Sequence, residues 1–221
     1  MTIRVWYNSI LVRLGIREVL PSDYIRTISV RENNEPIVAL SHSSNLLYDK
    51  EEKWEARNSV IEKLEKIAMR LKEERGLYIH LFELYRSPAK QQSLRDRHIA
   101  LLKSQNPSLP TEEIVKKVDK RVASIGGGHQ TGGAVDLTLC DSNGQPLDMG
   151  TKYDEFNALT PTHAKGLSHD AQNNRNILLK YMQQEGFVNY PNEWWHFCYG
   201  DKMWAAYANK KYAMYDIIET N

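Results

Sequence analysis

The chain has 221 residues, of which 41% are hydrophobic and 26% are charged, a balance typical of a folded globular protein rather than a disordered one. Its 29 Lys and Arg residues nearly equal its 28 Asp and Glu residues, so the formal net charge is only +1. This balance gives no electrostatic reason to expect a nucleic acid or an anionic membrane surface as a partner. The length suits one well-filled domain, expected over residues 1–221.

Arginines interrupt the apolar stretch at the start of the chain, at Arg4, Arg13 and Arg17. A secretory leader needs an unbroken apolar core of about 7–15 residues, and a membrane span needs roughly 20. We therefore expect no membrane span and a cytoplasmic protein, or a periplasmic one if a leader has been removed. The two cysteines, Cys140 and Cys198, are too few for a disulfide framework.

The spacing of apolar residues, with Pro and Gly signals, predicts the secondary structure along the chain. In chain order we expect strands over 25–30 and 37–40, a helix over 51–75, a strand over 77–85, helices from Pro88 and after the capping Thr111, a strand over 134–140, a loop over 145–169, a helix over 170–185, paired strands over 187–190 and 193–199, and a short helix over 202–210. This irregular alternation favours an α+β fold with a small, mainly antiparallel sheet flanked by helices. The role of residues 1–50 is left open.

Two short stretches combine histidine with a carboxylate. In GGGHQTGGAVDLTL, which covers 126–139, glycines allow a sharp turn before His129, and Asp136 lies in an otherwise apolar strand. A buried carboxylate is costly unless it is paired or bound to a cation. In EWWH, Glu193 and His196 pose the same problem among aromatic residues. Imidazole and carboxylate are zinc ligands, although each motif alone fits equally well a carboxylate paired with a surface lysine.

The remaining histidines have simpler interpretations. We expect His80 to be hydrogen-bonded within a sheet, and we expect solvent-facing side chains at His42, His98, His163 and His169.

In combination, the motifs resemble those of the M15 family of zinc D,D-peptidases. HQTGGAVD is similar to the family's HxxGxAxD motif and EWWH to its closing ExWH, while ELYRSPAKQQ supplies the arginine of its YR motif, Arg86. DLTL and DMGTKYD are similar to the D-alanyl-D-alanine dipeptidase branch, the vancomycin-resistance type. The motifs follow one another in family order over residues 77–199, so the resemblance covers about half of the chain.

The resemblance implies a set of chemical roles. One zinc ion per chain would be bound at the sheet by His129, Asp136 and His196, and Glu193 would be the general base that takes a proton from a metal-bound water. Arg86 would stabilise the oxyanion of the tetrahedral intermediate.

The resemblance also implies how the substrate is held. Asp154, in the MGxxxD segment, is expected to bind the free ammonium of a dipeptide. Gly127 stands where the family usually has a serine that helps to hold the substrate carboxylate, and a glycine turn here would form an anion-binding nest in its place. Glu83 is a candidate partner for Arg86, although on a regular strand residues three apart point to opposite faces.

Three alternatives remain open at this point. The substrate is D-alanyl-D-alanine or, because HQTG is similar to the carboxypeptidase branch, a longer peptidoglycan stem peptide trimmed by D,D-carboxypeptidase action. A noncatalytic zinc-binding interaction module, as in Hedgehog-type domains, is disfavoured because both Glu193 and Arg86 are present. Alternation puts Cys140 on the face of Asp136 and Cys198 on that of His196, so a disulfide or a soft metal ligand competes with the favoured interpretation of two buried free thiols.

Overall fold

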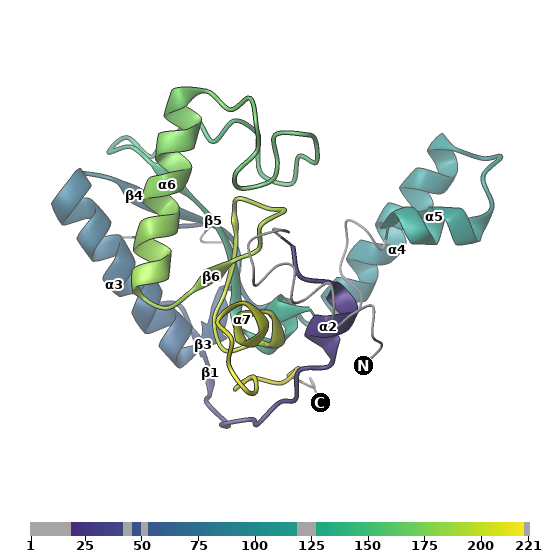
Figure 1. The fold of residues 1–221 in the computed structure, drawn as a ribbon, viewed down its shortest axis with the longest axis horizontal. Helices are drawn as coiled ribbons and strands as arrows, with labels where there is room; N and C mark the ends of the chain where they lie inside the picture. Colours follow the sequence, from purple (N-terminus) through teal and green to yellow (C-terminus); the bar gives the residue numbers. More distant parts are fainter. Residues whose placement is uncertain (1–18, 42–45, 50–52, 119–126, 219–221) are drawn as a thin grey trace.

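The strands form two sheets in the computed structural model, which describes residues 19–41, 46–49, 53–118 and 127–218 (Figure 1). The strands are β1 (Ile37–Ala39), β2 (Leu46–Leu47), β3 (Glu55–Arg57), β4 (Tyr78–Glu83), β5 (Ala134–Cys140), β6 (Val188–Asn189) and β7 (His196–Cys198). The main sheet has the order β2-β4-β5-β7-β6, and β1 pairs with β3 separately. Only the β2–β4 pairing is parallel among these described strands, so the prediction of a mainly antiparallel α+β fold is confirmed.

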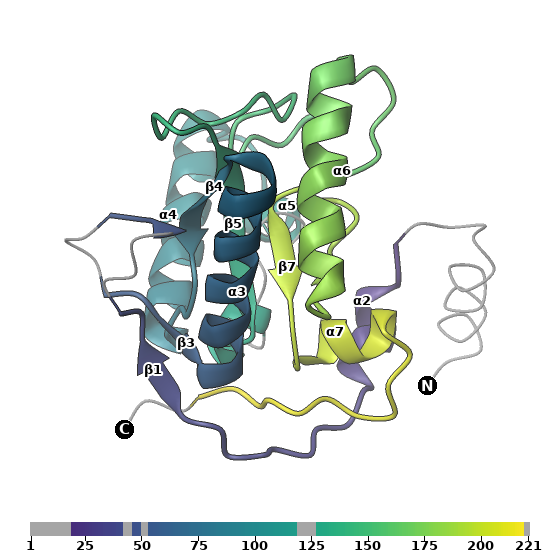
Figure 2. The ribbon, with the colours of Figure 1, turned by 90° about the vertical axis from the view of Figure 1, so that its left-hand side faces the viewer.

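Two of the helices cover one face of the main sheet, and two others project away from the body of the protein. They are α2 (Ser22–Arg26), α3 (Asn58–Arg75), α4 (Pro88–Gln105), α5 (Thr111–Val118), α6 (His169–Gln184), α7 (Lys202–Tyr207) and the 3₁₀ helix η1 (Gly128–Thr131). α3 and α6 contact each other and lie in front of the sheet in Figure 2. α4 and α5 pack together and extend away from the body as an arm (Figure 1).

The core lies between the sheet and these two covering helices. Every residue of β5 is buried, and Val135 and Leu137 belong to the same apolar cluster as Leu64 of α3 and Met182 of α6. Burying each such side chain contributes about 1.5–3 kcal/mol. Because side chains alternate along a strand, the neighbouring Asp136 points to the opposite face, away from this cluster.

Local signals determine where several helices begin and end. The hydroxyl of Ser87 accepts a hydrogen bond from the amide of Lys90 at 3.1 Å at the start of α4, and Ser168 caps α6 in the same way. Such caps are worth about 1 kcal/mol each. α3 ends at Gly76, whose φ of +66° favours glycine.

Four secondary-structure predictions were wrong in part. The helix predicted from residue 51 begins at Asn58, because Glu55–Arg57 pairs with β1, so Trp54 lies outside the helix. Ile25 lies in α2, and of 25–30 only Val30 makes an isolated bridge. Thr111 is the first residue of α5 rather than its cap. The last strand starts only at His196, because residues 190–196 form turns closed by backbone hydrogen bonds.

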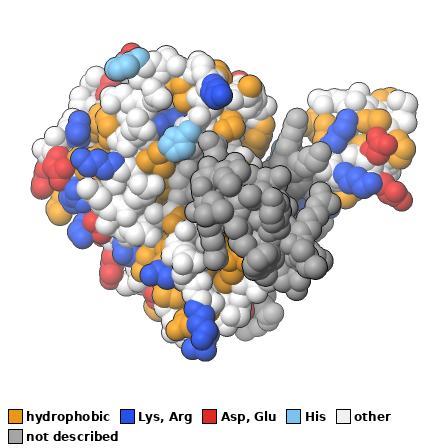
Figure 3. All heavy atoms as spheres, viewed as in Figure 1, with side chains coloured by type: hydrophobic (Ala, Val, Ile, Leu, Met, Phe, Trp, Pro, Cys, Tyr) orange, Lys and Arg blue, Asp and Glu red, His pale blue; other side chains and the backbone are white. Residues whose placement is uncertain are grey.

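Within the described ranges, no helix combines the length and the apolar character that crossing a membrane would require. On the face seen in Figure 3, Lys and Arg side chains alternate with Asp and Glu side chains on both the body and the arm. The described surface of this face therefore carries no large patch of one charge, consistent with the near-neutral composition.

Candidate active site

The register of the main sheet brings three polar residues into one row. Asp136 lies in the middle of β5, where it pairs with Glu83 of β4 on one side and with His196 of β7 on the other. Directly paired residues project their side chains on the same face, with Cβ atoms about 4.5–5.5 Å apart. Asp136 is therefore presented together with His196 on the face opposite the α3–α6 core.

The 3₁₀ turn η1 adds His129 to this row. Close packing favours glycine in and just after this turn: a Cβ at Gly128 would overlap Oδ2 of Asp201, and a Cβ at Gly133 would overlap the carbonyl oxygen of Tyr199. Gly132 ends the turn with a φ of +70°, in the left-handed region that favours glycine. The turn thus approaches β5 and β7 closely enough for His129 to reach Asp136.

Hydrogen bonding fixes the tautomer of His129. Its Nδ1 lies 2.7 Å from the carbonyl oxygen of Leu84, which can only accept, so Nδ1–H is the donor. In the neutral ring, Nε2 then presents a lone pair toward Oδ1 of Asp136 at 3.3 Å. A lone pair facing a carboxylate oxygen is unfavourable unless a proton or a metal ion lies between them. This outer hydrogen bond is the kind that orients metal-ligating histidines.

His129, Asp136 and His196 together form a candidate metal centre. One ligand atom from each lies within 4.8 Å of the others, and the three residues are 8%, 4% and 8% exposed. Two imidazoles and one carboxylate, leaving a fourth position free, are the donor set of a catalytic zinc site. The residues predicted as ligands are therefore brought together by the fold, and their chemistry fits zinc.

Electrostatics keep Asp136 ionised at the centre of this cluster. Burial would raise the pKa of Asp136, but His129 and His196 hold it below its usual value. Burial likewise opposes protonation of His196, but the carboxylate of Asp136, 2.9 Å from its Nδ1, raises the pKa of the imidazole. The hydroxyl of Tyr153 donates to Oδ2 of Asp136 at 3.1 Å. This contact, which the sequence reasoning missed, occupies the second carboxylate oxygen.

Arg86 is held rigidly beside the cluster. Its Nε donates to Oε1 of Glu83 at 2.7 Å, its Nη2 pairs with Oε2 of the same carboxylate, and its Nη1 donates to Gln91 at 2.8 Å. The pairing does not require a shared strand face, because β4 ends at Glu83 after a register shift and Arg86 lies beyond the strand. The amide of Arg86 donates to the carbonyl of His129 at 3.1 Å, which attaches the segment that carries the guanidinium to the η1 turn.

Glu193 occupies a turn directly before β7. Its amide donates to the carbonyl of Tyr190 at 3.0 Å, and its own carbonyl accepts from Nδ2 of Asn189 at 3.0 Å. Burial raises the pKa of Glu193 to about 7, and His196 and Asp136 are close enough to affect it. A carboxyl with this pKa is suited to exchange protons near neutral pH.

Asp154 lies in the long loop 145–168. It adopts a positive φ of 58°, and its side chain is exposed. Partial desolvation nevertheless raises the pKa of its carboxyl, which also senses the charges of His98, Asp136 and Arg86. Its neighbour Tyr153 stacks on Phe82 with ring centroids 4.2 Å apart. The loop therefore brings Asp154 toward the same face as the metal cluster.

Gly127 precedes η1, next to residues 119–126, which lie outside the described ranges. Its φ of −74° and ψ of 162° are ordinary extended values, and its carbonyl accepts from the amide of Gln130 at 3.0 Å. Its conformation therefore does not require glycine. Its role in holding a substrate carboxylate stays a prediction.

The two cysteines do not meet. Cys198 pairs with Ala134 at one end of β5, whereas Cys140 lies at the other end, about 20 Å away at ~3.3 Å per residue. Both are buried free thiols, as the favoured interpretation predicted. A disulfide between them is excluded by the register, and burial raises the pKa of the Cys198 thiol well above its ordinary value, which disfavours the thiolate that a metal would need.

The other histidines among the described residues do not belong to the cluster. His163 and His169 are exposed as predicted, whereas the same prediction was wrong in part for His98, which is half-buried on α4. His80 lies on β4, where burial lowers the pKa of its imidazole. His42 lies outside the described residues.

A buried His–Asp–His cluster, a carboxyl with a raised pKa and a fixed guanidinium define a metal-dependent hydrolase. Peptidase family M15, described as D-ala-D-ala dipeptidase, matches residues 38–217. The match covers most of the sequence and includes every predicted site residue. The chain belongs to this family.

The names of two curated relatives agree with this assignment. A D-alanyl-D-alanine dipeptidase of Synechocystis is 29% identical over 71% of this chain and 73% of its own length. A D-alanyl-D-alanine dipeptidase of Escherichia coli K12 is 40% identical, over 34% of this chain and 38% of its own length. A mutant of the vancomycin-resistance D,D-pentapeptidase VanY in complex with Zn(II) has a TM-score of 0.48 at 18% identity, covering 79% of this chain and 84% of that chain.

Proposed function

We propose that this metallopeptidase hydrolyses the D-alanyl-D-alanine dipeptide with one zinc ion per chain, bound by His129, Asp136 and His196. The family and the names of the relatives support this substrate. The observation that carries the proposal is that the buried cluster of candidate ligands lies beside both Glu193 and the fixed Arg86. A bound zinc ion would supply Lewis-acid polarisation of the scissile carbonyl and would lower the pKa of a coordinated water.

The chain's own side chains then perform the proton and charge transfers. Glu193 accepts a proton from the attacking water and returns it to the leaving amine, a role for which a pKa of about 7 suits it. Arg86 donates N–H groups to the oxyanion that develops on the substrate carbonyl. Because Glu83 and Gln91 already hold this guanidinium, little reorganisation is needed during the reaction.

Loop 145–168 provides selection for a short substrate. Asp154 is exposed on this loop, and the charges of Arg86 and Asp136 are close enough to affect the pKa of its carboxyl. Its carboxylate can therefore pair with the free ammonium of a dipeptide whose peptide bond lies at the His–Asp–His cluster. Gly127, at the start of η1, is the candidate contact for the substrate carboxylate.

A D,D-carboxypeptidase acting on peptidoglycan stem peptides would use the same ligands, base and arginine. The two substrates differ at the N-terminal side of the scissile bond, where a stem peptide has an acylated nitrogen and no charge. A carboxylate at Asp154 gains an ion pair only with the free dipeptide, which favours the dipeptidase. A noncatalytic zinc-binding module would have no use for Glu193 and Arg86.

Metal content and amine release test the proposal together. We expect the parent to bind one zinc ion per chain and to release D-alanine from D-alanyl-D-alanine. Glu193→Gln should keep the zinc but lose about 10²–10⁴-fold in rate. Glu185→Gln is a matched control, because Glu185 pairs with Lys66 and Arg70 of α3 on the far face of the sheet. Zinc bound by parent and variant, without hydrolysis of any D,D-peptide by either, would refute the proposal.

A further inference from the structure

The turn that carries His129 is fixed through its carbonyl groups. The carbonyl of His129 accepts from the amide of Arg86, that of Gln130 from the amide of Ile218 at 2.9 Å, and that of Gly132 from the amide of Arg57 at 3.0 Å. The remaining carbonyl, of Thr131, accepts from Nε of Arg57 at 2.8 Å. Four consecutive carbonyls are thus bound by donors from outside η1, and Arg57 supplies two of these donors.

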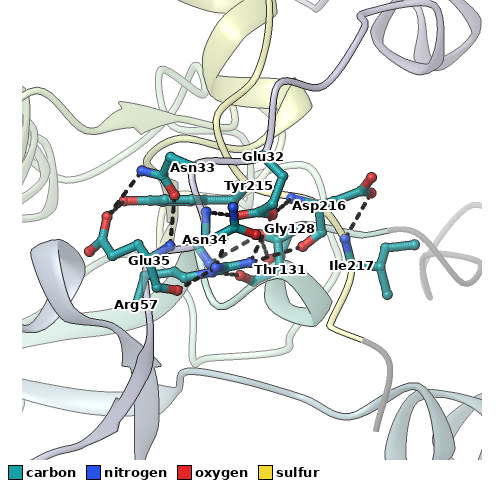
Figure 4. Close-up of polar contacts among 11 residues, drawn as sticks. Glu32, Asn33, Asn34, Glu35, Arg57, Gly128, Thr131, Tyr215, Asp216 and Ile217 are labelled. Atoms are coloured by element: carbon teal, nitrogen blue, oxygen red, sulfur yellow. Dashed lines mark hydrogen bonds and ion pairs between the residues drawn. The ribbon is translucent and has the colours of Figure 1, made fainter.

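Arg57 connects three segments that are distant in sequence (Figure 4). Besides the turn, its guanidinium donates to both carboxylate oxygens of Glu32 at 3.1 Å and to the carbonyl of Asp216 at 3.3 Å. The guanidinium also lies over the ring of Tyr215, 4.9 Å from its centroid. At 5% exposure, Arg57 uses its donors inside the protein rather than in solvent.

The segment before β1 and the C-terminal tail support this arginine. Glu32 neutralises the buried guanidinium and accepts a further hydrogen bond from the amide of Asp216 at 2.6 Å. The two segments pair with each other, since the amide of Arg31 donates to Ala213 and the amide of Asn33 donates to Met214. A buried charge needs such a partner, because an unpaired one is strongly unfavourable.

We propose that Arg57 is a positioning residue for the metal centre. Together with Glu32 it holds the carbonyls of Thr131 and Gly132, so that His129 stays in place opposite Asp136 before a metal ion binds. This inference rests on the proposed zinc site. It also gives a function to residues 29–35 and 213–218, which contain none of the candidate ligands: they keep the metal-binding turn rigid.

A second buried arginine provides a matched control. Arg175 of α6 is 2% exposed and donates to the carbonyls of Met149, Leu159 and Pro161. It therefore uses the same chemistry as Arg57, a buried guanidinium bound to backbone carbonyls, but it fixes loop 145–168 instead of η1. Replacing either arginine by lysine substitutes a single ammonium for the forked guanidinium and keeps the charge, so a general loss of stability should be similar in the two variants.

The test compares Arg57→Lys, Glu32→Gln and Arg175→Lys in the full chain. Zinc affinity is measured by competition with a chromophoric chelator, using zinc alone. Hydrogen exchange of the amides in 128–133 is measured separately on the metal-free proteins. We expect Arg57→Lys to lower zinc affinity about 10–100-fold, as is typical when a group that orients a ligand is changed. A smaller loss is expected for Glu32→Gln, and a smaller loss still for Arg175→Lys, because its loop reaches the cluster only through the hydrogen bond from Tyr153 to Asp136.

Hydrogen exchange of the metal-free proteins should show a larger effect for Arg57→Lys than for Arg175→Lys, as zinc affinity does. Amides in 128–133 should exchange faster in metal-free Arg57→Lys than in the parent, whereas those of Arg175→Lys should match the parent. If Arg57→Lys binds zinc within about threefold of the parent, or if Arg175→Lys weakens zinc binding equally, the positioning role is refuted. A parent that binds no zinc would overturn the proposed function instead, and the exchange rates would still decide whether Arg57 holds the turn.

Discussion

The metal-binding side of the candidate site is built on the sheet, whereas its substrate-binding side is built on a loop. Asp136 and His196 are neighbours in the β5–β7 register, and η1 is attached to the same framework through its carbonyls. Asp154 instead belongs to loop 145–168, in which buried Arg175 binds several backbone carbonyls. Under the proposed function, the sheet would therefore determine the chemistry, and the loop would determine which substrate is accepted.

This difference has an energetic basis. Moving a sheet residue by one position would turn its side chain to the other face and would expose the apolar residues that pack against α3 and α6. A loop has no such constraint, so its geometry depends on a few side-chain contacts, among them Trp194 Nε1 to the hydroxyl of Thr151 at 2.8 Å. Changes on the sheet side should therefore alter the rate, and changes on the loop side should alter substrate preference.

Among the changes that separate the sheet side from the loop side, the largest effect is expected for Arg86, the proposed donor to the oxyanion. Arg86→Lys should lower kcat about 10²–10³-fold, because a single ammonium cannot pair with Glu83 and also reach the oxyanion. KM for D-alanyl-D-alanine should change little. Arg70→Lys is the control and should leave steady-state kinetics unchanged, because Arg70 lies on α3, which covers the face of the sheet opposite the candidate site. An Arg86→Lys variant with a normal kcat and a raised KM would show instead that Arg86 acts in substrate binding and does not stabilise the oxyanion.

Glu193 should affect the stability of the metal-free protein in a pH-dependent way. Burial raises the pKa of Glu193 to about 7 from 4.5, so between these values the folded state binds this proton more tightly than the unfolded state. Stability should therefore fall as pH rises through this window, by at most about 3 kcal/mol. Glu193→Gln should lack this component, which urea unfolding at pH 5 and pH 8 would reveal. Equal pH dependence in parent and variant would contradict the burial of this carboxyl.

A smaller effect is expected where loop and sheet meet. Tyr153→Phe removes the hydroxyl that donates to Oδ2 of Asp136, while the ring can still stack on Phe82. Zinc affinity should fall by about tenfold or less, since the loss is one hydrogen bond to a metal ligand. Tyr181→Phe, which removes a hydrogen bond to Glu74 on the far side of the sheet, should leave it unchanged. If the variant lost its preference for the free dipeptide but bound zinc as tightly as the parent, Tyr153 would act in substrate selection and not in metal binding.

The sequence predicted the sheet side of the site well. Asp136 stands out because it is a charged residue in a mostly apolar strand, and the glycines before and after His129 predict a tight turn. Helices α3 and α6 follow from their 3.6-residue apolar period. The same period also predicted the start of α3 wrongly, because Trp54 matches the helical spacing by coincidence. The pairing of Glu55–Arg57 with β1 involves residues distant in sequence and could not be predicted from the local sequence pattern.

The supporting arginines could not be predicted from the sequence. Arg57 and Arg175 stand among polar residues and look like ordinary surface positions. Their burial depends on carbonyls supplied by segments far along the chain, such as Thr131 and Asp216 for Arg57. The pairing of Glu83 with Arg86, by contrast, was a candidate from the sequence and is confirmed. Strand alternation argues against it, and the end of β4 at Glu83 makes it feasible.

The division between sheet and loop is tested most directly by one ratio, kcat/KM for D-alanyl-D-alanine over kcat/KM for N-acetyl-D-alanyl-D-alanine. We predict that the parent strongly prefers the free dipeptide and that Asp154→Asn loses most of this preference while binding zinc as tightly as the parent. The adjacent control Glu155→Gln should keep it. A parent that hydrolyses the acetylated peptide faster, or an Asp154→Asn variant with the parent's ratio, would contradict the account.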